Sequence, residues 1–263
     1  MRIVSLCPSL TELVFALGLE EQLVAITKYC VHPVDGVAKI EKVAGTKDPD
    51  VERIIALAPD AVLLNEEENR IEDAEALQEA GIHLVNTFPK TPLETAPMVR
   101  HVGKALADLA EGPDEAQGIT ERAEAIALDI ESRCAQAIAA AATSAPVTFA
   151  YLIWRKPYMT VNGDTYPSAI LEQAGGQNVF ASHTDRFPAF EIAALIEANP
   201  NQIYLCTEPF PFEQKHIDEL AAATGFAPER FHIADGEYLS WHGSRTPAGV
   251  DYARALVGKA HPA

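Results

Sequence analysis

A helix–turn–strand unit occurs twice in this chain, and this duplication constrains the fold more than any other feature. The first copy is VERIIALAPDAVLL (residues 51–64) and the second is EIAALIEANPNQIYL (residues 191–205), aligned on Pro59 and Pro200. The aligned apolar pairs are Val51 with Ile192, Ile54 with Leu195, Ile55 with Ile196 and Val62 with Ile203. In each copy helical apolar spacing ends at the proline and a short apolar strand follows. Two copies are too few for a solenoid, so they indicate one α/β lobe in each half of the chain.

A long helical segment lies between the two copies. Residues 113–142 read PDEAQGITERAEAIALDIESRCAQAIAAAA, with a proline and acidic residues suited to a first helical turn. An apolar stripe at helical spacing is formed by Ile119, Ala123, Ile126, Ile130, Cys134 and Ile138. About 30 helical residues span ~45 Å. We therefore expect a rigid connector between the halves.

The pattern predicts an α/β fold of two lobes with mostly parallel sheets, bridged by one long α-helix. The expected domains are an N-terminal lobe at 1–110, a connecting helix at 111–144 and a C-terminal lobe at 145–263. A strand at 2–6 leads into the first helix, for which Ser9 or Thr11 is the expected cap. Ligands bind at the carboxyl ends of parallel strands, so two facing lobes predict a cleft between them.

Aromatic, charged and amide side chains follow six of the predicted strands and define the expected ligand-binding site. The candidates are Tyr29, Cys30, His32, Asn65, Glu67, Trp154, Arg155, Tyr158, Glu208, Trp241, His242 and Arg245. Each has a plain structural alternative, because charged loops are usually solvated and tryptophans often lie in the core. Arg155 and Arg245 are expected contacts for a carboxylate or phosphate on a ligand, or else surface ion-pair partners.

The stretch KYCVHP, residues 28–33, allows further interpretations. Thiolate and imidazole bind zinc, copper and haem iron, so Cys30 and His32 are weak candidates for a metal store or sensor. An enzyme would use Cys30 as nucleophile, with His32 or His242 as base. No oxyanion motif accompanies these residues. We expect the segment to form one wall of the ligand site and expect no catalysis.

Composition excludes several classes of partner. The net charge of -18 at pH 7 argues against nucleic acid and against an anionic membrane surface. The sequence has no apolar run of transmembrane length, so no membrane insertion is expected. Polar residues and Pro8 interrupt the apolar N-terminus, which is unlike a signal peptide. The chain as given is expected in the cytoplasm; a signal removed beforehand would place it in the periplasm.

Four parts of the chain carry a resemblance to a known family. RIVSLCPSLTELVFALG (residues 2–18), the duplicated unit, the central helix and GGQNVF (residues 175–180) resemble the helical-backbone, class III substrate-binding proteins of ABC importers. That family serves cobalamin, siderophores and haem, and the likeness is closest to its cobalamin-binding branch. The resemblance covers nearly the whole chain, and its opening motif and ALAPD–strand unit are fairly specific.

The resemblance implies non-catalytic binding of a small metal chelate, cobalamin or a related corrinoid, between two Rossmann-like lobes. It implies that Tyr29, Trp154 and Trp241 hold the ligand and that no other cofactor is required. It also implies that Glu72 or Glu67, together with Glu208, docks on an importer permease. Two departures are the missing secretion signal and the acidic NEEENR (residues 65–70), where cobalamin binders tend to offer an aromatic. They leave a changed ligand or a cytosolic relative of the family as alternatives.

Overall fold

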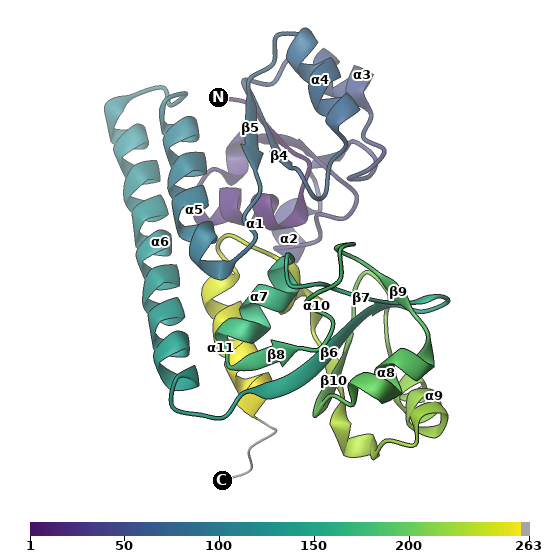
Figure 1. Cartoon of the computed structure of the whole chain (residues 1–263). Coiled ribbons are helices and arrows are strands. Elements are labelled where there is room, and N and C mark those ends of the chain that lie inside the picture. Colours follow the sequence, from purple (N-terminus) through teal and green to yellow (C-terminus); the bar gives the residue numbers. More distant parts are fainter. Residues whose placement is uncertain (259–263) are drawn as a thin grey trace. The chain divides into compact units, whose positions relative to one another are not determined.

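The computed structural model describes residues 1–258 and divides into two compact units. The first unit contains Met1–Pro89, Leu93–Ile130 and His242–Arg245. The second contains Lys90–Pro92, Glu131–Trp241 and the chain from Thr246. One long helix, α6 (Pro113–Ala141), continues from the first unit into the second (Figure 1). The predicted α/β architecture, with two sheets and one long helix, is confirmed.

The sheet of the first unit is entirely parallel. In the described chain its strand order is β3-β2-β1-β4-β5. The strands are β1 (Ile3–Ser5), β2 (Leu23–Ile26), β3 (Glu41–Lys42), β4 (Ala61–Asn65) and β5 (Leu84–Thr87). Every residue of β1 and β4 is buried, as expected for central strands covered on both faces. The parallel order places all the strand-end loops at one edge of the sheet.

Helices cover both faces of this sheet and complete its core. They are α1 (Pro8–Ala16), η1 (Glu20–Gln22), α2 (Val34–Val37), α3 (Val51–Ala56), α4 (Ile71–Glu79) and α5 (Pro92–Ala107). One core cluster joins Val4, Val62, Ile54 and Leu77 from strands and helices. The expected cap at Ser9 or Thr11 was wrong: Cys7 is the N-cap residue, and its side chain makes no capping hydrogen bond. Pro8 begins α1, a position where its missing N–H costs nothing.

The second unit contains a mixed sheet. Its order within the described residues is β11-β10-β6-β7-β9, and β8 also pairs with β6. The strands are β6 (Val147–Trp154), β7 (Tyr158–Thr160), β8 (Gly176–Asn178), β9 (Ala189–Phe190), β10 (Gln202–Cys206) and β11 (Phe231–Ala234). The helices are α7 (Tyr166–Gln173), α8 (Ile192–Ala198), α9 (Gln214–Thr224), η2 (Pro228–Arg230), α10 (Gly236–Ser240) and α11 (Thr246–Gly258). Among the described strand pairs of this sheet, β6–β7 and β7–β9 are antiparallel and the others are parallel.

The duplicated unit occupies the same place in both sheets. The first copy forms α3 and β4, and the second forms α8 and β10. β4 pairs with β1 and β5, just as β10 pairs with β6 and β11. Ile54 and its partner Leu195 are fully buried. The next aligned pair, Ile55 and Ile196, lies outside this buried face, since Ile55 is 40% and Ile196 42% exposed.

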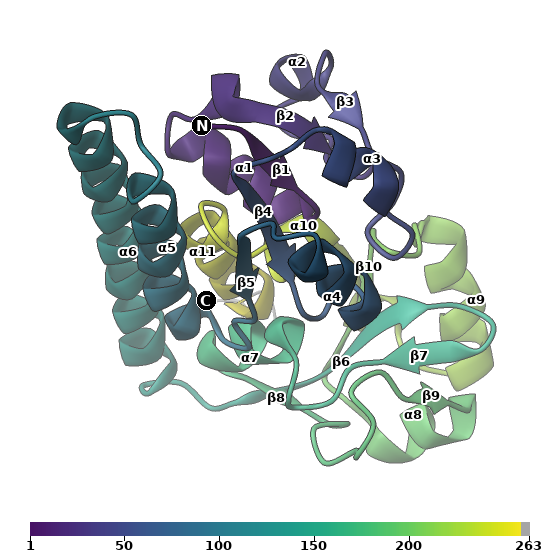
Figure 2. The same cartoon turned by 90° about the horizontal axis from the view of Figure 1, so that it is seen from above.

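The long helix has the predicted length but a shifted apolar face. α6 is 29 residues long, and both views show α5 lying beside it (Figures 1 and 2). Its buried residues are Ile119, Ala123, Ala127, Ile130, Cys134 and Ala137. The expected Ile126 is half-buried and Ile138 is 46% exposed, so the predicted stripe was wrong at these two positions. A Cβ on Gly103 of α5 would lie 2.4 Å from that of Ala123, so this close approach requires small residues.

Candidate functional site

Tyr29 stands at the carboxyl edge of the first sheet, in the turn that follows β2. Its side chain is 52% exposed, and the Lys28 ammonium lies 5.1 Å from the ring centroid. A Cβ on Gly45 would lie 3.2 Å from the Tyr29 ring, so the loop after β3 supports one side of it. Exposed aromatic rings at sheet edges are suited to contacting flat apolar ligands. Tyr29 therefore has the accessibility that its predicted role requires.

Cys30 follows Tyr29 but is enclosed by hydroxyl groups. Thr11 donates a hydrogen bond to the Cys30 sulfur at 3.1 Å, and the Thr27 hydroxyl lies 3.2 Å from it. Burial raises the pKa of the Cys30 thiol, and these hydroxyls offset only part of that shift. A thiol that retains its proton is a poor nucleophile and a poor metal ligand. His32, two residues further on, is half-buried.

Asn65, the last residue of β4, organises a buried polar network. Its carbonyl oxygen accepts hydrogen bonds from the backbone N–H groups of Glu67 and Glu68, at 3.0 and 3.2 Å. Its amide nitrogen donates to the Thr87 carbonyl at 3.2 Å and lies 3.4 Å from Nε2 of His242. The two backbone donors fix the amide orientation, so an N–H faces the His242 ring.

His242 is consequently a neutral acceptor. Its Nε2 atom receives the Asn65 amide and also lies 3.4 Å from the Ser9 hydroxyl. Burial lowers the pKa of His242 to about 4, and the side chain is 7% exposed. The network therefore assigns the ring proton to Nδ1. This arrangement places the sequence candidates Asn65 and His242 together, although 177 residues separate them.

Two further candidates of the first unit have internal partners. Arg245 forms a two-point ion pair with Glu12 at 2.5 and 2.9 Å, with the side chains 14% and 19% exposed. Gly243, whose φ of +98° favours glycine, turns the backbone between His242 and Arg245. Glu67 is half-buried, and its backbone carbonyl accepts a hydrogen bond from the Lys47 ammonium at 2.6 Å.

Trp154 ends β6 and is an exposed aromatic residue of the second unit. It is 40% exposed and meets Phe210 edge to face, with ring centroids 5.7 Å apart. Phe210 also contacts Phe212 and His216. Edge-to-face contacts orient rings, so this aromatic cluster holds the Trp154 indole in place while part of it stays accessible.

Arg155 and Tyr158 both contact Glu219 of α9. The Arg155 guanidinium lies 2.6 Å from one carboxylate oxygen, and the Tyr158 hydroxyl donates to the other at 3.0 Å. The hydrogen bond from Arg155 holds the pKa of Glu219 below its usual range. Burial raises the pKa of Tyr158, and Glu219 raises it further. The charge that was expected to meet a ligand is compensated within the protein.

Glu208 and Trp241 also contact one another. The Trp241 indole N–H donates to the Glu208 carboxylate at 2.7 Å, and Trp241 is only 8% exposed. Gly236 leaves room for this contact, since a Cβ there would lie 2.6 Å from Cγ of Glu208. Trp241 is therefore largely a core residue of the second unit, with its polar atom satisfied.

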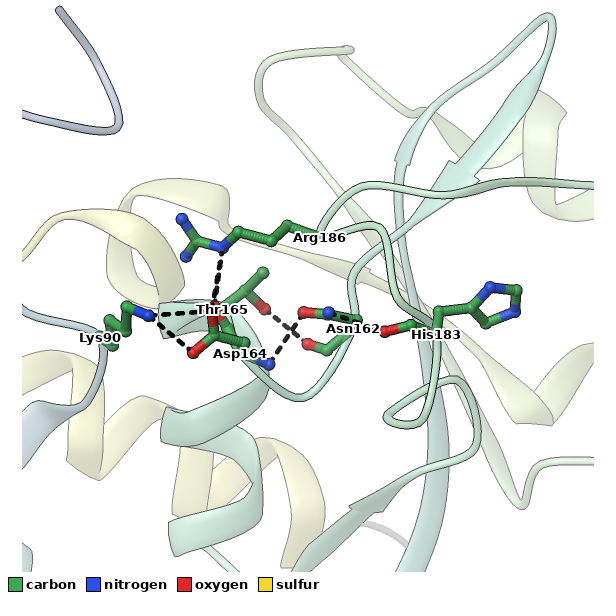
Figure 3. A network of polar contacts seen from close by, with 6 residues as sticks. All are labelled: Lys90, Asn162, Asp164, Thr165, His183 and Arg186. Carbon is green, nitrogen blue, oxygen red and sulfur yellow. Dashed lines mark hydrogen bonds and ion pairs between the residues drawn. The ribbon is translucent and has the colours of Figure 1, made fainter.

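The sequence analysis missed a polar cluster around Asp164, at the start of α7 (Figure 3). The Lys90 ammonium contacts both carboxylate oxygens of Asp164 at 2.9 and 3.0 Å. Arg186 donates to the Asp164 carbonyl at 2.9 Å, and its Nε lies 3.6 Å from the carboxylate. The available signal was the Asn-Gly-Asp turn at 162–164 before a helix.

Among residues 1–258, no group of three or more His, Cys, Asp or Glu side chains is placed to hold a metal ion. No helix in that range combines the length and apolarity needed to cross a bilayer. The metal and enzyme alternatives gain no specific observation from this geometry.

Comparison with known proteins identifies the family. Residues 3–227 match the family described as periplasmic binding protein. The chain belongs to this family. Among curated relatives of this periplasmic binding protein, the vitamin B12-binding protein of Vibrio parahaemolyticus is 28% identical over 203 residues, covering 77% of this chain and 70% of the relative. That of Photorhabdus laumondii is 29% identical over 205 residues, covering 78% and 70%.

Solved structures support the same fold for this periplasmic binding protein. The periplasmic vitamin B12 binding protein BtuF of Vibrio cholerae has a TM-score of 0.80 at 23% identity, covering 100% of this chain and 98% of that one. The periplasmic heme-binding protein RhuT from Roseiflexus has a TM-score of 0.82 at 24% identity, covering 99% of both chains. The predicted resemblance to ABC importer binding proteins is confirmed at the level of family and fold. The cleft expected between the lobes stays a prediction.

Proposed function

We propose that this periplasmic binding protein binds cobalamin or a related corrinoid as the substrate-binding component of an ABC importer. Relatives named for vitamin B12 support the choice of ligand class. The observation that carries the proposal is an exposed aromatic side chain at the strand-end edge of each sheet. Tyr29 is 52% exposed in one unit, and Trp154 is 40% exposed in the other.

The physical argument concerns what such rings do for a flat chelate. A corrin ring presents a broad apolar face with amide groups at its rim. Tyr29 and Trp154 offer apolar area for that face at a low cost in conformational entropy, because each has only two side-chain torsions. In the first unit, the polar loop that Asn65 holds after β4 suits the amide rim.

A titration tests the proposal directly. Cyanocobalamin absorbs visible light and quenches tryptophan emission, so binding can be followed by fluorescence and by equilibrium dialysis. We expect saturable one-to-one binding that weakens at least about tenfold in Tyr29→Ala and in Trp154→Ala, which is the range for an aromatic anchor. Leu128→Ala is the matched control, because Leu128 is 53% exposed but lies on α6. No saturable binding by the wild-type protein would refute the proposal.

The importer contact is a further part of the proposal. Glu72, at the start of α4, is exposed at the surface, and its carboxylate lies 3.4 Å from Arg70. The Glu208 carboxylate already accepts the Trp241 indole, so we assign it a structural role ahead of docking. Charge reversal at Glu72 should weaken capture by permease-containing vesicles and leave cyanocobalamin binding unchanged. Unchanged capture would remove Glu72 from the interface.

A further inference from the structure

The basic side chains beside the proposed ligand site determine which ligand charges it accepts. Haem, and siderophores of the carboxylate type, carry free carboxylates, which proteins usually bind with arginine or lysine. Within residues 1–258, seven such residues lie in the loops that directly follow parallel strands, and an eighth, Arg245, lies in the loop after α10. They are Lys28, Lys47, Arg70, Lys90, Arg155, Lys156, Arg186 and Arg245. The available cations are those not already compensated by the protein.

Asp164 compensates two of these cations in the second unit. Its carboxylate receives the Lys90 ammonium at 2.9 and 3.0 Å and lies 3.6 Å from Nε of Arg186 (Figure 3). The close-up shows the Lys90 ammonium and the Nε atom of Arg186 both facing Asp164. An incoming ligand carboxylate would have to displace Asp164 from both partners.

Glu219 compensates one more, Arg155, and also feels the charge of the exposed Lys156. Arg155 contacts its carboxylate at 2.6 Å, and the charge of Lys156 helps lower the pKa of the same group. The Tyr158 hydroxyl, which could otherwise donate to a ligand, is also directed to Glu219 at 3.0 Å. The loop around Trp154 therefore presents an aromatic ring with little net positive charge.

The basic residues of the first unit have partners as well. Arg245 is paired with Glu12 at 2.5 Å, and Arg70 lies 3.4 Å from Glu72. Lys28 lies 4.0 Å from Asp48.

Lys47 donates to the backbone carbonyl of Glu67 and sits beside the acidic run at 66–68. In that run, Glu66 is exposed and its carboxylate accepts a hydrogen bond from the neutral Asn86 amide. This part of the edge adds negative charge.

We propose that the site selects a chelate without free carboxylates, meaning a neutral or cationic corrinoid with an amide rim, and rejects anionic chelates such as haem. The inference rests on the proposed function and names the charge class of its ligand. The aromatic rings can contact either kind of flat ring, so they do not discriminate between haem and a corrinoid. Discrimination comes from the basic side chains, which are already paired within the protein and so are not available to a ligand carboxylate. Proteins commonly discriminate against a ligand by leaving its charged group without a partner or by placing a like charge near it.

Binding of three ligands by three variants tests the inference. The ligands are cyanocobalamin, aquocyanocobinamide and haemin, which are neutral, cationic and anionic at neutral pH. The variants are Asp164→Asn and Glu219→Gln, which release cations at nearly constant shape, and Glu197→Gln as control. Glu197 is exposed on α8, so its variant removes the same charge from the same unit away from the strand-end loops.

We expect the wild-type protein to bind both corrinoids and to bind haemin at least about tenfold more weakly. Asp164→Asn and Glu219→Gln should each strengthen haemin binding about tenfold, with little change for cyanocobalamin and none in Glu197→Gln. Retained cyanocobalamin binding also reports that the variants are folded. The gain should shrink at high salt, because screening weakens charge contacts.

Two kinds of failure are distinguishable. Equal binding of haemin and corrinoids by the wild-type protein, or haemin binding unchanged in both releasing variants, would overturn the charge selection and leave the proposed function in place. Absence of corrinoid binding together with haemin binding gained in Asp164→Asn would overturn the proposed function and support the charge selection.

Discussion

His242 is held neutral inside the first unit, so replacing it should change how stability depends on pH. Burial lowers the pKa of His242 from 6.5 to about 4 in the folded protein. The unfolded chain exposes the ring and restores its ordinary pKa. Between the two values the unfolded state binds a proton that the folded state does not. The contribution of His242 is therefore complete above the unfolded pKa and is lost as the pH falls from 6.5 toward 4.

The size of the effect follows from these two pKa values. At about pH 5, the unfolded ring is almost fully protonated and the folded ring is still almost neutral. The difference of roughly 1.5 pKa units between the unfolded value and this pH corresponds to about 2 kcal/mol of lost stability. Burial is the cause of this cost, because the protonated ring would have to carry its charge away from water. In His242→Gln the titrating group is gone, and this part of the loss disappears.

Urea unfolding followed by tryptophan fluorescence, at about pH 8 and about pH 5, measures the effect. The free energy of unfolding should fall by about 2 kcal/mol less in His242→Gln than in the wild-type protein. His101→Gln is the control, since His101 is exposed on α5, and its pH dependence should match the wild type. Equal losses in His242→Gln and the wild type would refute the buried neutral ring.

Two stability predictions concern the packing that positions the site. Gly103→Ala should destabilise by about 1–3 kcal/mol through overpacking between α5 and α6, whereas Gly118→Ala, which meets only the flexible end of Arg122 at 3.4 Å, should stabilise α6 by about 0.5–1 kcal/mol. Thermal unfolding should show a lower melting temperature for Gly103→Ala and a higher one for Gly118→Ala, and a lower melting temperature in both variants would contradict the prediction. Ile54→Ala should cost about 2–5 kcal/mol and Ile55→Ala less than about 1 kcal/mol; comparable losses would mean that the face of α3 is misassigned.

Local sequence patterns were sufficient to predict most elements of the fold. α6 begins at the predicted Pro113, and both copies of the duplicated unit form a helix and a strand at the aligned positions. These signals succeed because proline positions and apolar runs act over a few residues. Helical spacing did not distinguish Ile54 from Ile55, since both lie on the side of α3 that spacing alone would bury. The sheet decides which one it covers.

The site was harder to predict because its partners are distant in the chain. Arg155 was correctly placed at a strand end, whereas the expectation for Arg245 was wrong, because helix α10 lies between β11 and that residue. Their ion-pair partners lie 64 and 233 residues away. A basic residue next to an aromatic residue looks the same in the sequence whether its side chain binds a ligand or forms an ion pair within the protein. The difference depends on tertiary contacts, which no local pattern records.

The duplicated unit also explains why the two strand-end edges differ. Asn65 ends β4, and the aligned position at the end of β10 is Cys206. An amide both accepts and donates, so Asn65 holds the loop that follows it and the His242 ring at once. A buried cysteine cannot replace those contacts.

The second unit therefore fastens the corresponding loop by other means. The Thr207 hydroxyl accepts the Gly236 N–H at 3.0 Å, and Glu208 accepts the Trp241 indole at 2.7 Å. Divergence at one aligned position thus leaves a neutral amide network at one edge. At the other edge, the Glu208 carboxylate accepts a hydrogen bond from the Trp241 indole. Neither arrangement supplies a positive charge, which is the physical basis for expecting a ligand without free carboxylates.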